Sequence, residues 1–275
     1  MRKINIKNAW LKNTKLGLIT FGVLGALLSN ANAANIITGG ASKKDCEDTN
    51  CEFGRIGVGG GYYGFAGSNA NIDNYIGYVS LGIKEVYKAR FQGEVDIVLG
   101  GGKGEQKGSA FPQNFRRSAD AFIFEPTIKL GVNVLTKRVP LFVNVVGGIE
   151  HYRLGFGNAN KFNRFIGLVG AELNGEIPAG DKFRLTYGAG YSWIFGADYG
   201  FDNTTAKIKG SPSNYAINAN LGFEYDLSKG LYAYARLIGK YQHINASSSV
   251  TYNSNNVSHP ASKGFAGMLE VGLGF

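Results

Sequence analysis

The chain has 275 residues, of which 44% are hydrophobic, 13% are aromatic and 41 are Gly, and its mean hydropathy is −0.09. This length suits one sizeable domain, and a hydropathy near zero excludes a bundle of membrane-spanning helices. The 29 Lys and Arg residues outnumber the 20 Asp and Glu residues, and the formal net charge of +9 would by itself allow a nucleic-acid partner.

Residues 1–33 have the three parts of a secretory signal peptide. Five Lys and Arg residues precede the apolar run Leu16–Leu28, and an Ala-Asn-Ala cleavage pattern follows it at 31–33. A run of 13 apolar residues is too short to span a membrane as a helix, so we expect this segment to be cleaved during export. Its removal takes five cations and no acid and leaves 24 cations against 20 acids, a net charge of +4. We therefore expect no nucleic-acid partner.

Residues 34–52 are polar and contain both cysteines of the chain, Cys46 and Cys51. We expect a periplasmic lead-in in which these two residues close a short disulfide loop, because the exported compartment is oxidising. A metal site would need further soft ligands, and no His lies nearby. No metal or cofactor is predicted.

From Phe53 onward the chain repeats a segment of alternating apolar and polar residues followed by a turn or loop, a pattern typical of strands with one apolar face. The clearest segment is Tyr87–Leu99. Pro126 predicts a local bulge, and the middle of Val139–Leu154 is apolar on both faces, which leaves its phase open. The expected strands are 53–65, 73–84, 87–99, 119–134, 139–154, 164–176, 182–195, 213–227, 231–244 and 263–275.

The connections between these segments alternate in length. Short turns near residues 85, 137, 179 and 229 alternate with longer loops at 100–118, 155–163, 197–212 and 245–262. Short turns at one end and long loops at the other are typical of transmembrane barrels, and a soluble sandwich gives no reason for them. A closed barrel also leaves no backbone group unpaired in lipid. The sequence therefore predicts an all-β domain over 53–275, a closed ten-stranded antiparallel transmembrane β-barrel with aromatic residues near both ends of its strands.

The last segment, Lys263–Phe275, has apolar residues at alternate positions and ends in an aromatic residue. It resembles the closing strand of bacterial outer-membrane β-barrels, and residues 53–275 as a whole resemble the small porin-like, opacity-type surface barrels. This resemblance implies a place in the outer membrane of a Gram-negative cell, contact with its lipid and lipopolysaccharide, and recognition of Phe275 by the barrel assembly machinery.

The polar faces of the strands would line the lumen. Ten strands lie close to the number at which side chains fill a barrel interior, so we expect a plugged or barely wet lumen, with a narrow pore for ions or small solutes as the alternative. Seven cations and eight acids fall on these faces, and we expect them to pair because unpaired buried charges are costly. The predicted lumen residues are Lys88, Arg90, Glu94, Asp96, Glu125, Lys129, Glu150, Arg164, Glu172, Arg184, Glu224, Asp226, Arg236, Lys240 and Glu270.

The Gly-rich stretch 100–104 contains Lys103 but lacks the spacing and the Ser or Thr of a phosphate-binding loop, so we expect a flexible hairpin loop. Its cations and those that follow, Lys103, Lys107, Arg116 and Arg117, are candidates for contact with lipopolysaccharide phosphates, with a solvated loop as the alternative.

Three functions compete. The favoured one is a non-enzymatic surface or envelope protein whose loops contact a host molecule or another ligand that the sequence does not identify, and the narrow pore comes second. The third is a hydrolase or acyltransferase at the rim. Ten-stranded proteases of the omptin type share the strand number, but they need an Asp-His pair, and no Asp-x-His occurs here. We predict no catalytic residue and expect His151, His243 and His259 to be solvated.

Overall fold

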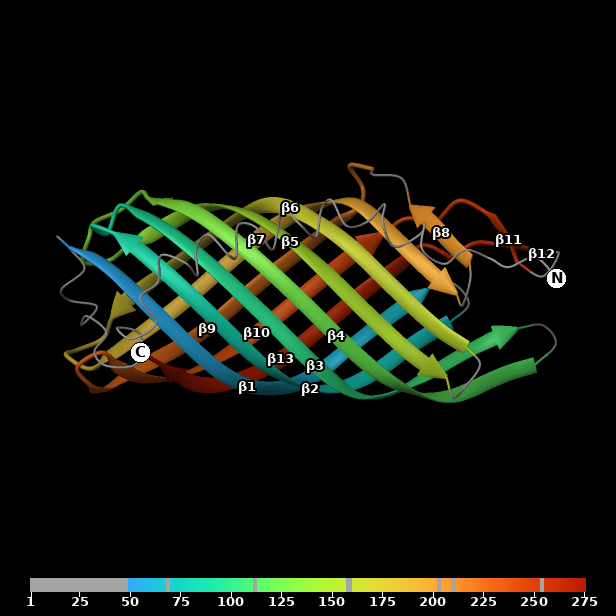
Figure 1. The fold of residues 1–275 in the computed structure, drawn as a ribbon, viewed down its shortest axis with the longest axis horizontal. Coiled ribbons are helices and arrows are strands. Elements are labelled where there is room, and N and C mark those ends of the chain that lie inside the picture. Colours follow the sequence, from blue (N-terminus) through green and yellow to red (C-terminus); the bar gives the residue numbers. More distant parts are fainter. Residues whose placement is uncertain are drawn as a thin grey trace, which may run out of the picture.

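A computed structural model describes residues 49–67, 70–110, 113–156, 160–201, 204–208, 211–252 and 255–275. Ten long antiparallel strands form a closed barrel (Figure 1). No helix long and apolar enough to cross a membrane occurs in the described part of the chain. The barrel strands are β1 (Asn50–Gly67), β2 (Ala70–Tyr87), β3 (Phe91–Ala110), β4 (Gln113–Asn133), β5 (Leu141–Phe156), β6 (Asn160–Pro178), β7 (Phe183–Phe201), β9 (Tyr215–Ser228), β10 (Leu231–Ile244) and β13 (Ser262–Gly274).

Each barrel strand pairs with its neighbours in the chain, and β13 pairs with β1 to close the ring. Beyond β13, Phe275 exchanges both backbone hydrogen bonds with Gly54, at 2.7 and 2.9 Å. Closure removes the free edges at which an open sheet would pair with other chains. The predicted fold is confirmed, and β10 has the predicted bounds.

Three shorter strands lie at one end of the barrel, which we call the hairpin end (Figure 1). They are β8 (Thr204–Ile208), which extends the sheet beside β7, and the separate pair β11 (Val250–Tyr252) and β12 (Asn255–Val257). The opposite end, where Phe275 and the short turns lie, is the turn end.

The outer surface of the barrel is apolar. Alternate residues of every barrel strand point outward, and many are half exposed or more, such as Tyr75 at 73%, Val145 at 66% and Leu130 at 63%. A soluble monomer rarely exposes so large an apolar area, whereas a membrane barrel presents it to lipid. The surface and the fold together are those of an integral β-barrel of the kind that spans bacterial outer membranes.

Outward aromatic side chains form a belt toward the hairpin end, as expected for the membrane interface. Ring contacts run across neighbouring strands from Tyr191 to Tyr215 at 5.7 Å, to Tyr241 at 6.0 Å, and to Phe265 at 5.0 Å. Tyr62 and Tyr75 continue the belt across β1 and β2, at 6.0 Å.

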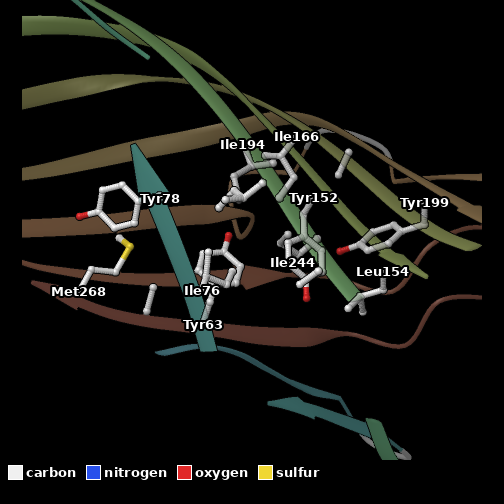
Figure 2. Packing of buried hydrophobic residues seen from close by; sticks show 14 of the residues in the cluster. Tyr63, Ile76, Tyr78, Tyr152, Leu154, Ile166, Ile194, Tyr199, Ile244 and Met268 are labelled. Carbon is white, nitrogen blue, oxygen red and sulfur yellow. The ribbon is translucent and has the colours of Figure 1, made fainter. Parts of the chain in front are cut away.

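Inward residues pack against one another inside the barrel (Figure 2). Toward the hairpin end they include large buried side chains such as Tyr63, Tyr152, Leu154, Tyr199 and Ile244. The sequence left open which residues of the fifth strand face the lumen. In β5, even-numbered residues from Phe142 to Leu154 point inward, and Val143 and Val145 point outward.

The strands are longer than predicted. Asn50–Glu52, expected in the lead-in, belong to β1, and the expected loops 100–118 and 155–163 are mostly strand. The Gly-rich stretch 100–104 is likewise not a flexible loop. Gly102 lies in β3, and a Cβ there would meet the backbone of Tyr75 and lie 2.9 Å from the Cα of Ile76. Close approach of β2 therefore accounts for this Gly, and the hairpins satisfy their backbone groups by pairing beyond the apolar belt.

The third expected strand, 87–99, contains a turn at its start. β2 ends at Tyr87, and Lys88 and Ala89 reverse the chain with φ angles of 48° and 49° before β3 begins at Phe91. The amide of Arg90 donates to the carbonyl of Tyr87 at 2.9 Å. The apolar-polar alternation runs through this turn without Gly, Pro or Asn, so periodicity alone does not reveal it.

The predicted bulge at Pro126 is wrong, because the register of β4 with β3 and with β5 is the same on both sides of this residue. A bulge occurs instead in β7, between the pairs Gly167–Gly196 and Leu168–Ile194, and leaves Phe195 unpaired. The extra residue changes the phase of the strand. As a result Ile194 and, beyond the bulge, Ala197 and Tyr199 all point inward.

Cys51 packs at the turn end with Phe53, Val86 and Phe142, and no cysteine of the described part is free. Cys46, its expected partner, and the expected signal 1–33 lie outside the described residues.

Candidate functional site

The structure places the predicted lumen residues inside the barrel, with two exceptions. Lys88 and Arg90 lie exposed in the turn between β2 and β3, so the prediction that they line the lumen is wrong. Within the described part of the chain, three further charged residues point inward that were not predicted to do so, Arg55, Lys84 and Glu176. Arg55 shares a face with Gly57 and Gly59, and this Gly-rich face carries no clear alternation.

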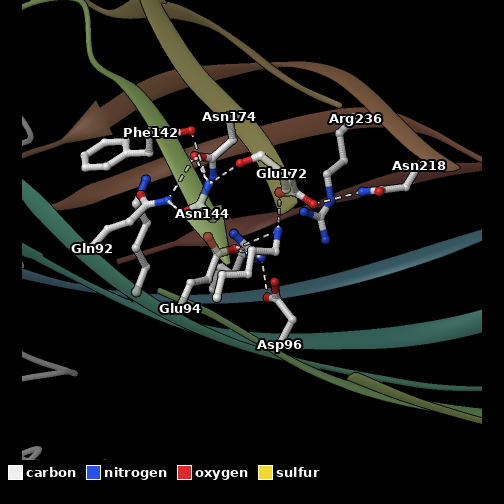
Figure 3. A network of polar contacts seen from close by, with 12 residues as sticks. Gln92, Glu94, Asp96, Phe142, Asn144, Glu172, Asn174, Asn218 and Arg236 are labelled. Atoms are coloured by element: carbon white, nitrogen blue, oxygen red, sulfur yellow. Dashed lines mark hydrogen bonds and ion pairs between the residues drawn. The ribbon is translucent and has the colours of Figure 1, made fainter. Parts of the chain in front are cut away.

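A polar network crosses the turn half of the barrel (Figure 3). Lys129 on β4 lies 2.7 Å from a carboxylate oxygen of Glu172 on β6 and 3.9 Å from Glu94 on β3. Arg55 on β1 binds Glu94 at 2.7 Å and contacts Asp96 as well. Two of these contacts link strands that are not neighbours in the sheet, β1 with β3 and β4 with β6, so the network ties together one side of the barrel wall.

Amide groups extend the network on the side of the turn end. Asn174 accepts from Gln92 at 2.9 Å and from Asn144 at 3.1 Å, and Asn144 also donates to the carbonyl of Glu172 at 3.0 Å. The pairs Lys84–Glu176 at 3.2 Å, Arg184–Glu224 at 3.1 Å and Arg236–Glu270 at 2.9 Å lie in the same half, and Asp226 also binds Arg184. The charges of this half are therefore paired, as expected.

A second layer fills the hairpin half, and we call it the Arg164 layer: Arg164, Glu150, Tyr63, Phe65 and Tyr152. Arg164 binds the carboxylate of Glu150 and donates to the hydroxyl of Tyr63 at 3.0 Å. The guanidinium lies 3.8 Å from the ring centroid of Phe65 and 5.6 Å from that of Tyr152. The side chains of Arg164 and Glu150 are each 2% exposed, so this ion pair is shielded from solvent.

A loop lies on the hairpin side of this layer. His259 stacks on the inward ring of Tyr199, with centroids 3.7 Å apart and planes 16° apart. Ser247 accepts from the backbone of His259 at 2.8 Å and donates its own amide to the carbonyl of His259 at 2.9 Å. Burial lowers the pKa of His259 to about 4, so this histidine is neutral at pH 7 and is not the solvated residue that was expected.

Two cavities lie inside the barrel, one within the polar network and the other between that network and the Arg164 layer. One of about 90 Å³ is lined by the polar network, including Arg55, Glu94 and Glu224. The other, of about 160 Å³, is lined mostly by apolar side chains. Both touch Lys129, Glu172, Asn220 and Arg236, which therefore form the partition between them.

The other two histidines face outward, toward the aromatic belt. His151 lies between Phe122 and Phe165, with centroid distances of 6.2 and 6.5 Å, and His243 stacks on Tyr215 at 5.7 Å. No group of three or more His, Cys, Asp and Glu residues able to hold a metal occurs in the described part of the chain.

The candidate lipopolysaccharide residues lie on the hairpin formed by β3 and β4. Lys103 is exposed, and Lys107 lies 3.1 Å from the carboxylate of Glu105 and 3.6 Å from that of Asp73. Arg116 and Arg117 pair in register with Lys107 and Gln106.

Comparison with known proteins places the chain by its fold alone. No protein-family model matches, and neither does any curated protein sequence. Among solved structures, the outer membrane protease OmpT from Escherichia coli is similar with a TM-score of 0.61 at 11% identity, over 82% of this chain and 96% of that one. The translocator domain of the autotransporter NalP from Neisseria meningitidis matches with a TM-score of 0.40 at 10% identity, over 94% and 97% of the two chains. The outer membrane protein OprG from Pseudomonas aeruginosa matches with a TM-score of 0.38 at 11% identity, over 83% and 95%.

Proposed function

We propose that this outer-membrane barrel is closed to ions, has no enzymatic activity and acts through its hairpin end, in surface interaction or envelope structure. In outer-membrane barrels the longer connections face the outside, which puts the hairpin end at the cell surface and the turn end in the periplasm.

The Arg164 layer supports this proposal. The Arg164 side chain is 2% exposed in the hairpin half of the barrel, and its guanidinium contacts a carboxylate, a hydroxyl and two aromatic rings. A conducting pore needs a continuous water-filled path, whereas here Arg164 on β6 reaches across the lumen to Tyr63 on β1 and pairs with Glu150 on β5.

The experiment is conductance in a planar lipid bilayer. We expect no channel steps from the native protein and steady steps from the double variant Arg164→Ser/Glu150→Ser, because it removes both charged members of the layer. The matched control Arg184→Ser removes a cation near the turn end, keeps the layer and stays silent. Steady steps from the native protein would contradict the proposal, and so would a double variant that folds, as judged by heat-modifiable gel migration, yet stays silent.

A narrow pore is the second candidate, and one observation favours it. Two cavities lie in the interior and are separated by side chains alone. Native channels whose ion selectivity changes in Glu94→Gln would establish this candidate.

The action of the hairpin end is tested by replacing Val250–Val257, which spans β11 and β12, with a Gly-Ser linker of equal length. If the protein acts in surface interaction, adhesion of bacteria to host cells falls while resistance of the envelope to detergent stays. If it acts in envelope structure, detergent resistance falls instead. A folded variant unchanged in both would contradict this proposal.

A further inference from the structure

The larger cavity, of about 160 Å³, differs from the polar layers on either side of it. Its wall includes Ile76, Tyr78, Ile123, Leu168, Ile238 and Met268, from five different strands. A cavity of roughly 150 Å³ with apolar walls is large enough to hold benzene. The space therefore fits one small ring or a branched alkyl group.

Three buried polar atoms belong to residues of this wall and have no hydrogen-bond partner: Glu125 Oε1, Gln242 Oε1 and Tyr78 Oη. Glu125 and Gln242 are 6% and 5% exposed. A buried polar atom without a partner is costly, so each of these atoms would gain from a ligand.

The other polar atoms of the same two side chains are already bound. Glu125 Oε2 accepts from Lys240, and Gln242 Nε2 donates to Glu150 Oε2 at 2.6 Å. Because a carboxylate only accepts, the amide of Gln242 must present its Nε2 to Glu150, and its free atom is the acceptor. The unpartnered atoms are thus two acceptors and a hydroxyl, and a ligand that pairs with them has to donate hydrogen bonds.

The charged side chains of the wall are four carboxylates, Asp96, Glu125, Glu150 and Glu172, and three bases, Lys129, Arg236 and Lys240. Asp96 and Glu150 are also paired with Arg55 and Arg164, which lie outside the wall. The preference for a cationic donor therefore comes from the unpartnered oxygen of the Glu125 carboxylate and not from the net charge of the wall.

We propose that the cavity is a binding site for a small aryl- or alkylammonium compound, with its apolar group among Ile123, Ile238 and Met268 and its ammonium toward Glu125 and Gln242. The partition formed by Lys129, Glu172, Asn220 and Arg236 is the way in from the turn end, since the Arg164 layer closes the other side. The site itself does not depend on the proposed function.

The test is isothermal titration of the full, folded protein in detergent micelles with benzylammonium, toluene and benzoate. We expect saturable binding of one benzylammonium. Toluene should bind about tenfold more weakly, because it lacks the charge-assisted hydrogen bond, and benzoate should not bind. No saturable binding of benzylammonium would mean that the cavity holds water only and would overturn the proposal.

Variants place the ligand. Ala216→Leu on β9 fills the cavity from its wall and should abolish binding, whereas Ala235→Leu, which lines the other cavity, should leave it unchanged. Ile238→Phe serves if the Ala216 variant does not fold. Glu125→Gln should weaken benzylammonium about tenfold and leave toluene within about twofold. Equal binding to the native protein and a folded cavity-filling variant would contradict the proposed location, and equal affinity for toluene and benzylammonium would contradict the role of the acceptors.

Discussion

Lys240 on β10 and Glu125 on β4 form an ion pair inside the barrel, although the two strands are not neighbours in the sheet and 115 residues separate the pair. Interior contacts of this kind join opposite walls, and backbone pairing alone does not. We predict that Lys240→Met lowers the free energy of unfolding by about 3–5 kcal/mol, because it leaves a buried carboxylate unpaired. The double variant with Glu125→Gln should recover most of that loss. Urea unfolding in lipid vesicles measures both, and a double variant no more stable than Lys240→Met would show that the pair does not act as a unit.

Gly102→Ala should destabilise the barrel by about 1–3 kcal/mol, because the added methyl group meets the backbone of β2 and forces the two strands apart. Gly267→Ala on β13 is the matched control, since a Cβ there meets nothing within 4 Å. The midpoint of urea unfolding compares them. Equal midpoints for the two variants would contradict the close approach of β2 and β3.

The packing of His259 should depend on pH. Burial lowers the pKa of this residue to about 4 in the folded protein, against about 6.5 for an unfolded chain. The unpacked loop therefore takes up a proton first, and packing is lost progressively as the pH falls from about 6.5 to about 4, while it is complete above that range. The protection factors of the Ser247 and His259 amides, which correct hydrogen exchange for its intrinsic dependence on pH, should fall as the pH drops through this window.

Two variants test the origin of that dependence. His259→Phe keeps a ring against Tyr199 and should make these protection factors independent of pH over this range. His243→Phe, on the outer surface, should leave the dependence as it is. Arg164, whose charge also disfavours a proton on His259, is present in both.

Lipopolysaccharide binding at the hairpin of β3 and β4 remains a prediction. Gln substitutions at Lys103, Arg116 and Arg117 should lower the amount of lipopolysaccharide that co-purifies with the folded protein, because each removes a donor to phosphate. Lys107→Gln should matter less, since Glu105 and Asp73 already lie near that ammonium. Co-purification unchanged in the triple variant would leave these residues as a solvated surface.

The outward faces of the strands followed from the sequence because lipid and lumen impose opposite polarity on neighbouring residues. Segments that obey this rule throughout, such as Leu231–Ile244, were predicted to the residue. The rule cannot locate a turn or bulge where the residues on both sides of it still alternate in polarity. The turn at Lys88 and Ala89 continues the alternation, and the bulge at Phe195 exchanges one apolar phase for another.

The pairing of interior charges was expected from cost alone, but the partners were not. Which acid meets Arg164 depends on how far the strands are staggered around the barrel, and no single strand carries that information. The aromatic rings around Arg164 come from β1 and β5. The alternation of polarity predicts that these rings point inward, but not that they contact Arg164.

The pairing of Gly54 with Phe275 bears on the order in which the protein folds. β1 finds one of its two partners immediately, in β2, but its other partner is made from the far end of the described chain. Contacts between segments so distant in sequence form late, so one edge of β1 stays without a hydrogen-bonding partner until β13 pairs with it. The exported chain therefore needs a partner that covers the unpaired edge of β1 until β13 reaches it, and the risk of misassociation is greatest while β1 to β10 are paired and β13 is not.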